Sequence, residues 1–136
     1  MGTLRTDDLL DEAARNGVRV RQADLGERWG HYDDDARCIT LNVTMTDPQV
    51  RSTLAHELDH AWHRDRTVHD PDEHRRRERR ADATAARRLI SPIEYAIAER
   101  MVGPDPRALA DELDVAPWVI EVFQREADIG RKWTRA

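Results

Sequence analysis

Two histidines lie four residues apart, with a glutamate directly after the first, in the sequence HELDH at residues 56–60. Apolar side chains recur around them at helical spacing, and Asp47-Pro48 is typical of a helix start. A helix puts His56 and His60 on one face, about one turn apart, where both imidazoles can reach one zinc ion. Glu57 could then act as the general base on a metal-activated water.

A catalytic zinc site takes three protein ligands and leaves one position for water. Glu78 is the preferred third ligand, because it lies eighteen residues after His60 on the next predicted helix, which a loop allows to return antiparallel. Asp82 follows one turn later on the same face, where its carboxylate can accept a hydrogen bond from His56. His63 is rejected as a ligand, because it would lie about 10 Å from His56 along the helix axis.

Other polar residues remain open for roles at this site. His74 and His69 could each be the third ligand or could stabilise the developing oxyanion, and Tyr32 and His31 are alternatives from a predicted hairpin. The arginine-rich segment 75–80 is interpreted as a solvated helix face, and the sharper alternative is a contact with an acidic substrate or a nucleic acid.

The remaining pattern predicts an α+β fold, in which a small antiparallel sheet precedes a set of packed helices. The predicted order is a helix, three extended segments around an Asp33-Asp34-Asp35 turn, the motif helix, and four more helices, at residues 4–15, 18–21, 28–32, 36–43, 47–64, 73–90, 91–101, 106–113 and 117–128. Gly103-Pro104 breaks the helical pattern. We therefore expect a core domain over residues 1–103 and a C-terminal helical segment over 104–136 packed on it.

Composition excludes several classes of protein. With 36% charged and 39% hydrophobic residues, the chain is not expected to be disordered. Its net charge of −5 gives no nucleic-acid footprint, and its one cysteine, Cys38, excludes an internal disulfide framework and a cysteine-based zinc finger. The acidic N-terminus is unlike a signal peptide, and no apolar run is long enough to span a membrane, so we expect a cytoplasmic protein.

Two segments resemble a known family. Residues 53–61, TLAHELDHA, resemble the LAHELGHA helix of the ImmA/IrrE metallopeptidases, and residues 78–90, ERRADATAARRLI, resemble that family's ExxAD…AAxLL helix. Residues 37–42 resemble the strand that precedes the metal-binding helix. The resemblance covers residues 18 to 125 and is tight over the two motifs.

This resemblance implies a zincin-like core in which His56, His60 and Glu78 hold a Zn²⁺ ion and Glu57 is the base. It also implies a protein substrate, namely a helix-turn-helix transcriptional repressor, and agrees with an origin in phages or other mobile elements. Asp59 stands where the family often has glycine, and sequence reasoning gives this carboxylate no role.

The leading hypothesis is a zinc endopeptidase that cleaves a regulatory partner protein, whose extended chain would pair with the strand at residues 39–43. The alternative is a zinc-containing regulator that acts by protein binding without proteolysis. The C-terminal segment resembles a helix-turn-helix, but its second helix carries Glu121, Glu126 and Asp128 against Arg125. Such a helix would repel phosphates, so we expect it to pack on the core or on a partner rather than bind DNA directly.

Overall fold

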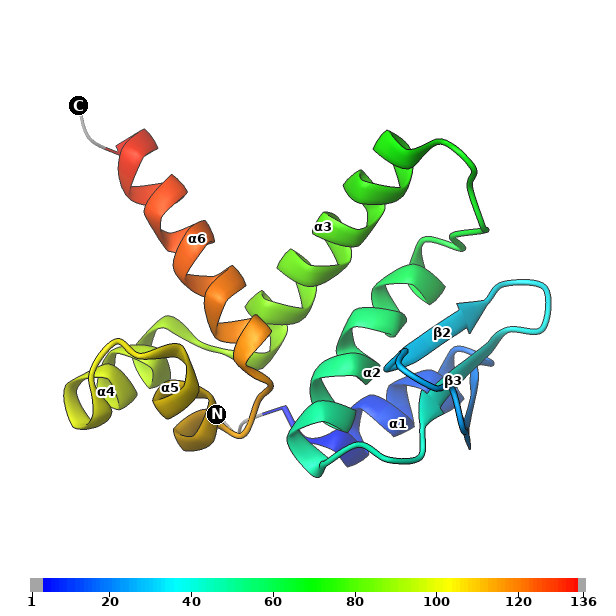
Figure 1. Ribbon diagram of the computed structural model, residues 1–136, viewed down its shortest axis with the longest axis horizontal. Coiled ribbons are helices and arrows are strands. Elements are labelled where there is room, and N and C mark those ends of the chain that lie inside the picture. The colour runs from blue at the N-terminus through cyan, green and yellow to red at the C-terminus, as the bar shows by residue number, and fades with distance from the viewer. Residues whose placement is uncertain (1–3, 135–136) are drawn as a thin grey trace.

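The computed structural model describes residues 4–134, with side chains described up to residue 128. Over this range the chain forms six helices and three strands (Figure 1). They are α1 (Thr6–Arg15), β1 (Arg19–Ala23), β2 (Gly30–Asp33), β3 (Cys38–Asn42), α2 (Asp47–Trp62), α3 (Pro71–Leu89), α4 (Pro92–Val102), α5 (Pro106–Leu113) and α6 (Pro117–Thr134). The predicted α+β class is confirmed. Among the described residues, no helix has both the length and the apolar character needed to cross a membrane.

The three strands form a mixed sheet in the order β1–β3–β2, so the prediction of a wholly antiparallel sheet is wrong. β2 and β3 form an antiparallel hairpin, whereas β1 pairs with β3 in parallel. The loop between β1 and β2 is held at the end of β3, because the Asn42 side chain donates hydrogen bonds to the Gly26 and Arg28 carbonyls at 2.9 and 2.8 Å. Since β3 is paired on both sides, the prediction that a substrate strand adds at residues 39–43 is also wrong.

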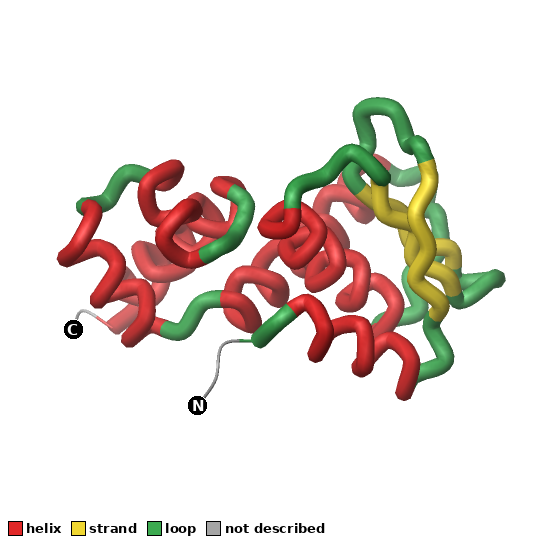
Figure 2. Tube along the Cα trace, turned by 90° about the horizontal axis from the view of Figure 1, so that it is seen from below, coloured by secondary structure: helices red, strands yellow, loops and turns green. Residues whose placement is uncertain are grey.

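Helix α2 is the element against which most of the fold packs. It begins with a capping box, in which the Thr46 hydroxyl accepts from the Gln49 amide and the Gln49 side chain accepts from the Thr46 amide. Helices α1 and α2 lie on one face of the sheet (Figure 2), and Leu9, Ile39 and Leu54 are fully buried in this core. Helices α3 and α6 form a V in Figure 1, with the end of α3 and the start of α6 at its apex.

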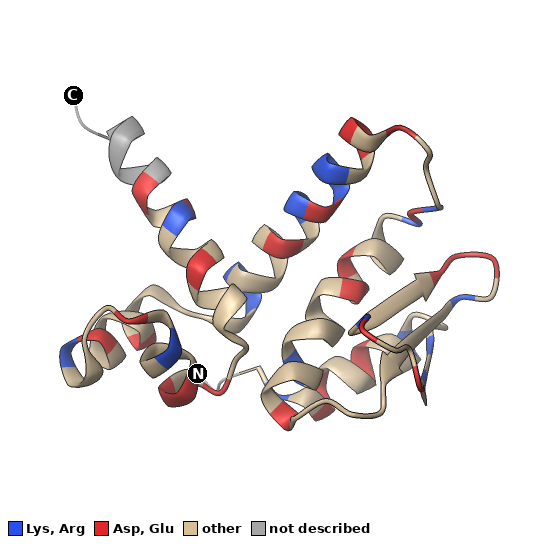
Figure 3. Ribbon diagram, viewed as in Figure 1, with Lys and Arg blue, Asp and Glu red and all other residues tan. Residues whose placement is uncertain are grey.

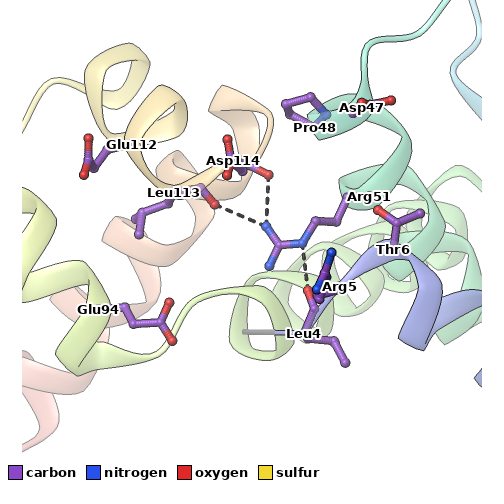
Figure 4. A pocket seen from close by; sticks show the side chains of 10 residues that line it. All are labelled: Leu4, Arg5, Thr6, Asp47, Pro48, Arg51, Glu94, Glu112, Leu113 and Asp114. Carbon is purple, nitrogen blue, oxygen red and sulfur yellow. Dashed lines mark hydrogen bonds between the residues drawn. The ribbon is translucent and has the colours of Figure 1, made fainter. Parts of the chain in front are cut away.

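Two buried polar residues of α2 attach the C-terminal helices to it. Arg51 is 6% exposed, and its guanidinium donates to the carbonyls of Leu4, Leu113 and Asp114 at 2.8, 3.2 and 2.9 Å beside a cavity of about 530 Å³ (Figure 4). Ser52 is fully buried, and its hydroxyl accepts a hydrogen bond from the main-chain amide just before α6 at 2.9 Å. These bonds fix the start of α6 against the helix that carries the HELDH motif.

Candidate metal and catalytic site

Helix α2 presents His56 and His60 on the same face, as their spacing predicts. Their Nε2 atoms lie 3.2 Å apart, and their rings meet edge to face with centroids 4.9 Å apart. Glu57 is only 7% exposed, and its Oε2 atom lies 3.9 Å from His56 Nε2. One helical turn therefore brings two imidazoles and a buried carboxylate to one place.

Helix α3 runs back past α2 and brings Glu78 to the same point. Its Oε2 atom lies 2.9 Å from Nε2 of His56 and 2.9 Å from Nε2 of His60. Zinc bonds to nitrogen and oxygen of about 2.0–2.2 Å are compatible with donor atoms at this spacing. Among the described residues, these three side chains form a group that could hold one metal ion.

The second nitrogen of each imidazole bonds to a carboxylate. His56 Nδ1 lies 2.8 Å from Asp82 Oδ1, and His60 Nδ1 lies 2.8 Å from Asp65 Oδ2. A carboxylate can only accept here, so each Nδ1 donates, and in the neutral form of the ring each Nε2 keeps its lone pair. In that form the two lone pairs and the Glu78 oxygen point at one another and repel unless a positive charge, a proton or a metal ion, lies between them. The donor set therefore fits a metal ion.

Asp65 is the site residue that sequence reasoning missed. It lies five residues after His60 and beyond the end of α2, so it has no helical spacing from the motif. Arg64 adopts a left-handed φ of 55°, which reverses the chain and lets the Asp65 amide donate to the His60 carbonyl at 2.9 Å. Glycine or asparagine usually marks such a helix end, and an arginine there gives no signal in the sequence.

Burial and hydrogen bonds shift the acidity of the site. Burial alone would lower the pKa of His56, but hydrogen bonds to Asp82 and Glu78 raise it to about 10. Hydrogen bonds from His56 and His60 hold the pKa of Glu78 far below its usual range. Burial raises the pKa of Glu57. These hydrogen bonds favour a proton on the imidazoles, which a metal ion would displace on binding. The raised pKa of the buried Glu57 suits a general base.

Two cavities, of about 460 and 250 Å³, open onto the site and share Glu57 and Glu78. Helix α6 lines the larger cavity, where the ring of Trp118 meets that of His56 edge to face with centroids 6.0 Å apart. Strand β2 and the loop between α2 and α3 line the smaller cavity. The carboxylates of Glu57 and Glu78 are therefore approached from both the β2 side and the α6 side.

The other candidate histidines lie at different distances from this centre. His74 is near it, with Nε2 3.8 Å from the outer oxygen of Glu78 and 62% of its side chain exposed. His69 is exposed in the loop between α2 and α3 and lines neither cavity. His63 caps α2, and its Nδ1 donates to the Asp59 carbonyl at 2.9 Å.

The two candidates on β2 differ from each other. Tyr32 is buried, and its hydroxyl donates to Asp34 at 2.6 Å and accepts from Arg37 at 2.7 Å, so its hydrogen bonds are used within the hairpin. His31 is exposed and lines the smaller cavity, where its Nδ1 accepts from Arg28 at 3.3 Å.

Asp59 and most arginines of α3 are paired with opposite charges. Asp59 is 5% exposed, and its Oδ2 atom lies 2.9 Å from Nε of Arg80. Figure 3 shows acidic and basic residues alternating along α3. The arginine ion pairs of this helix are Arg75 with Asp72, Arg76 with Glu73, Arg77 with Glu73 and Asp65, Arg80 with Asp59 and Asp65, and Arg88 with Glu12. Because these arginines are already paired with carboxylates, the pairing favours the interpretation of a solvated helix face over that of a surface that binds an acidic substrate or a nucleic acid.

Comparison with known proteins gives one family. Residues 13–116, well over half of the chain, match the model of the peptidase M78 family, described as the IrrE N-terminal-like domain. The matched range includes α2 and α3 with all three metal donors, and ends just before α6. No curated protein matches the chain.

Proposed function

Because the chain belongs to the peptidase M78 family, the metallopeptidases of the ImmA/IrrE type, we propose that it is a zinc-dependent endopeptidase acting on a regulatory protein. The observation that carries this proposal is the convergence of His56 Nε2, His60 Nε2 and Glu78 Oε2 within 3.2 Å of one another. Each histidine is oriented by a carboxylate on its other nitrogen, which is the usual arrangement of zinc-binding histidines.

The roles of the residues follow from their chemistry. His56, His60 and Glu78 hold the metal, which when bound supplies Lewis-acid activation of water and of the scissile carbonyl. Glu57, buried beside them, accepts a proton from the attacking water and returns it to the nitrogen of the leaving amine. Its raised pKa makes it a stronger base than an exposed glutamate. We propose that His74, whose Nε2 atom lies 3.8 Å from the outer oxygen of Glu78, contacts the developing oxyanion.

The free edge of β2 offers a place for an extended substrate. β2 pairs only with β3, so its other edge is unpaired among the described strands. Gly30 on β2 packs so tightly on α2 that an added Cβ would lie 3.4 Å from Glu57 Cγ. A peptide that adds to this edge would therefore lie beside the general base, and its main chain would supply the hydrogen bonds. A transcriptional repressor is the substrate that we propose.

Zinc binding and proteolysis are tested with two variants and a control. We expect the wild type to bind one zinc ion per chain by elemental analysis, Glu78→Gln to bind it at least tenfold more weakly, and Glu57→Gln to bind it normally. His69→Gln, an exposed histidine outside both cavities, is the matched control and should bind zinc as the wild type does. Cleavage is measured by mass spectrometry on a peptide library derived from helix-turn-helix repressors.

We expect cleavage by the zinc-loaded wild type and none by Glu57→Gln. Cleavage that persists in Glu57→Gln would refute the assignment of the general base. A wild type that binds zinc and its partner but cleaves nothing, and keeps its biological effect as Glu57→Gln, would instead support the non-proteolytic regulator.

A further inference from the structure

Asp59 is a buried charge inside the HELDH motif. Its side chain is 3% exposed, and it lies one residue before the ligand candidate His60. An isolated buried carboxylate would be strongly destabilising, so this position requires a cation. Arg80 of α3 supplies it, with Nε 2.9 Å from Asp59 Oδ2.

The same guanidinium reaches a second carboxylate. While its Nε bonds to Asp59, its Nη2 donates to Oδ2 of Asp65, and both partners are largely shielded from solvent. The Asp65 oxygen that accepts from Arg80 also accepts from Nδ1 of His60 at 2.8 Å. Asp59, Arg80, Asp65 and His60 therefore form one continuous chain of contacts from α2 to α3 and back.

The two histidines differ in what holds their carboxylate partners. Asp82, the partner of His56, lies in the middle of α3 and is fixed by the helix. Asp65, the partner of His60, lies in the loop after α2, where no regular structure fixes its side chain. Arg80 holds this side chain instead, since its planar guanidinium can bond to two carboxylates at once in a fixed geometry. Arg77 lies farther away, with Nη1 3.8 Å from the other Asp65 oxygen.

We propose that Asp59, Arg80 and Asp65 are positioning residues for the metal centre: Asp59 anchors Arg80, Arg80 holds Asp65, and Asp65 orients His60. Arg80 lies two residues after Glu78, so the same contacts set the register of the third ligand against α2. This inference rests on the proposed metal site. The carboxylate of Asp59, which the two-histidine motif itself does not require, thereby has a role as the anchor of Arg80.

The experiment separates positioning from simple helix packing. Two variants remove the charges while keeping hydrogen-bonding groups. They are Asp65→Asn, and the double variant Asp59→Asn/Arg80→Gln, which removes the buried charge of Asp59 together with its cation and leaves Asp65 with His60 at 2.8 Å and Arg77 at 3.8 Å. The control is Glu12→Gln/Arg88→Gln, which neutralises an ion pair between α1 and α3 whose arginine is about as exposed as Arg80 and whose carboxylate is more exposed than Asp59, away from the proposed metal donors. Zinc affinity is measured by competition with a chromophoric chelator, and cobalt(II) binding by its visible absorption. Thermal unfolding of the metal-free proteins is recorded in parallel.

Both Asp65→Asn and the double variant should bind zinc about tenfold more weakly than the wild type, the scale typical of lost partners of metal-binding histidines. Their cobalt(II) spectra should change, because the donor geometry changes. The control should keep wild-type affinity and spectrum even if its unfolding temperature falls.

Zinc affinity within twofold of the wild type in both variants, together with lowered unfolding temperatures, would overturn the inference and leave a simple packing pair. If the double variant does not fold, the zinc affinity of Asp65→Asn alone tests the inference. A wild type that binds no zinc would overturn the proposed function as well. If the wild type and the variants bind zinc equally well, only the positioning role is overturned.

Discussion

The close contact between Gly30 of β2 and Thr53 of α2, beside the proposed general base Glu57, gives a prediction about stability. At Gly30, an added Cβ would lie 2.6 Å from Thr53 Cγ2, which is closer than carbon atoms approach in folded proteins. Gly30 does not have a positive φ, so alanine can adopt its backbone conformation. The loss of stability in Gly30→Ala therefore comes from the steric clash. Overpacking of this kind costs about 1–3 kcal/mol.

The clash can be relieved by one substitution on the other side. Thr53→Ser removes Cγ2, and alone it should cost about 1 kcal/mol, because Thr53 is 4% exposed and loses one buried methyl group. In the double variant the new Cβ of residue 30 takes the place of the missing methyl. The free energy of unfolding should therefore fall by less than the sum of the single effects, with a coupling energy of about 1–2 kcal/mol.

Urea unfolding of the metal-free proteins, followed by circular dichroism, measures the four corners of this cycle. Thr84→Ser on α3 is the control, because it also removes a threonine methyl but has no contact with Gly30, and it should add independently. A coupling energy below about 0.5 kcal/mol between positions 30 and 53 would refute the packing argument.

Three further predictions concern the remainder of the fold. Arg51→Met should lower the free energy of unfolding by about 3–5 kcal/mol, because it leaves several carbonyls of other segments without a donor; a loss under about 1 kcal/mol by urea unfolding would contradict this. Ser52→Ala should cost about 1–3 kcal/mol and speed hydrogen exchange at the Ala116 amide, whose acceptor it removes; unchanged exchange would argue against that bond. Hydrogen bonding by Arg64 lowers the pKa of Asp34 below its ordinary 3.8, so its stabilising contribution is present above that pH and is lost as pH falls through the folded pKa. Urea unfolding between pH 2 and 6 should give a flatter pH dependence for Asp34→Asn, and equal slopes would disprove the link.

The candidate metal donors could be located from sequence because helical geometry is local. His56 and His60 share a face by spacing alone, and Glu78 was chosen because a helix that returns after a loop brings it opposite them. The structure brings these three together. Asp82 bonds to His56, as its position four residues after Glu78 on the same helix suggests. Asp65 could not be found, because its position depends on a left-handed arginine rather than on a period.

The sheet shows the limit of the same reasoning. Alternation in residues 18–21 and 36–43 indicates extended segments, but it contains no information on which strand pairs with which. β1 pairs with β3 in parallel, and the loop that follows β1 is held by the Asn42 side chain, which lies more than ten residues further along the chain. Asp59 was unexplained for a similar reason, because its partner Arg80 lies in the interior of an arginine-rich segment that resembles a solvated face.

The segment from α2 to α3 has a consequence for the order in which the protein folds. It carries all three metal donors and both carboxylates that bond to their histidines, within residues 47–89. During synthesis, this helical hairpin emerges from the ribosome before α5 and α6 emerge to be attached to Arg51 and Ser52. Closing the short loop between α2 and α3 carries a small entropic cost, and metal binding adds its own free energy to folding. A metal ion bound at the proposed site would therefore stabilise the nascent chain early, and the supply of that metal during translation would then influence how much folded protein accumulates.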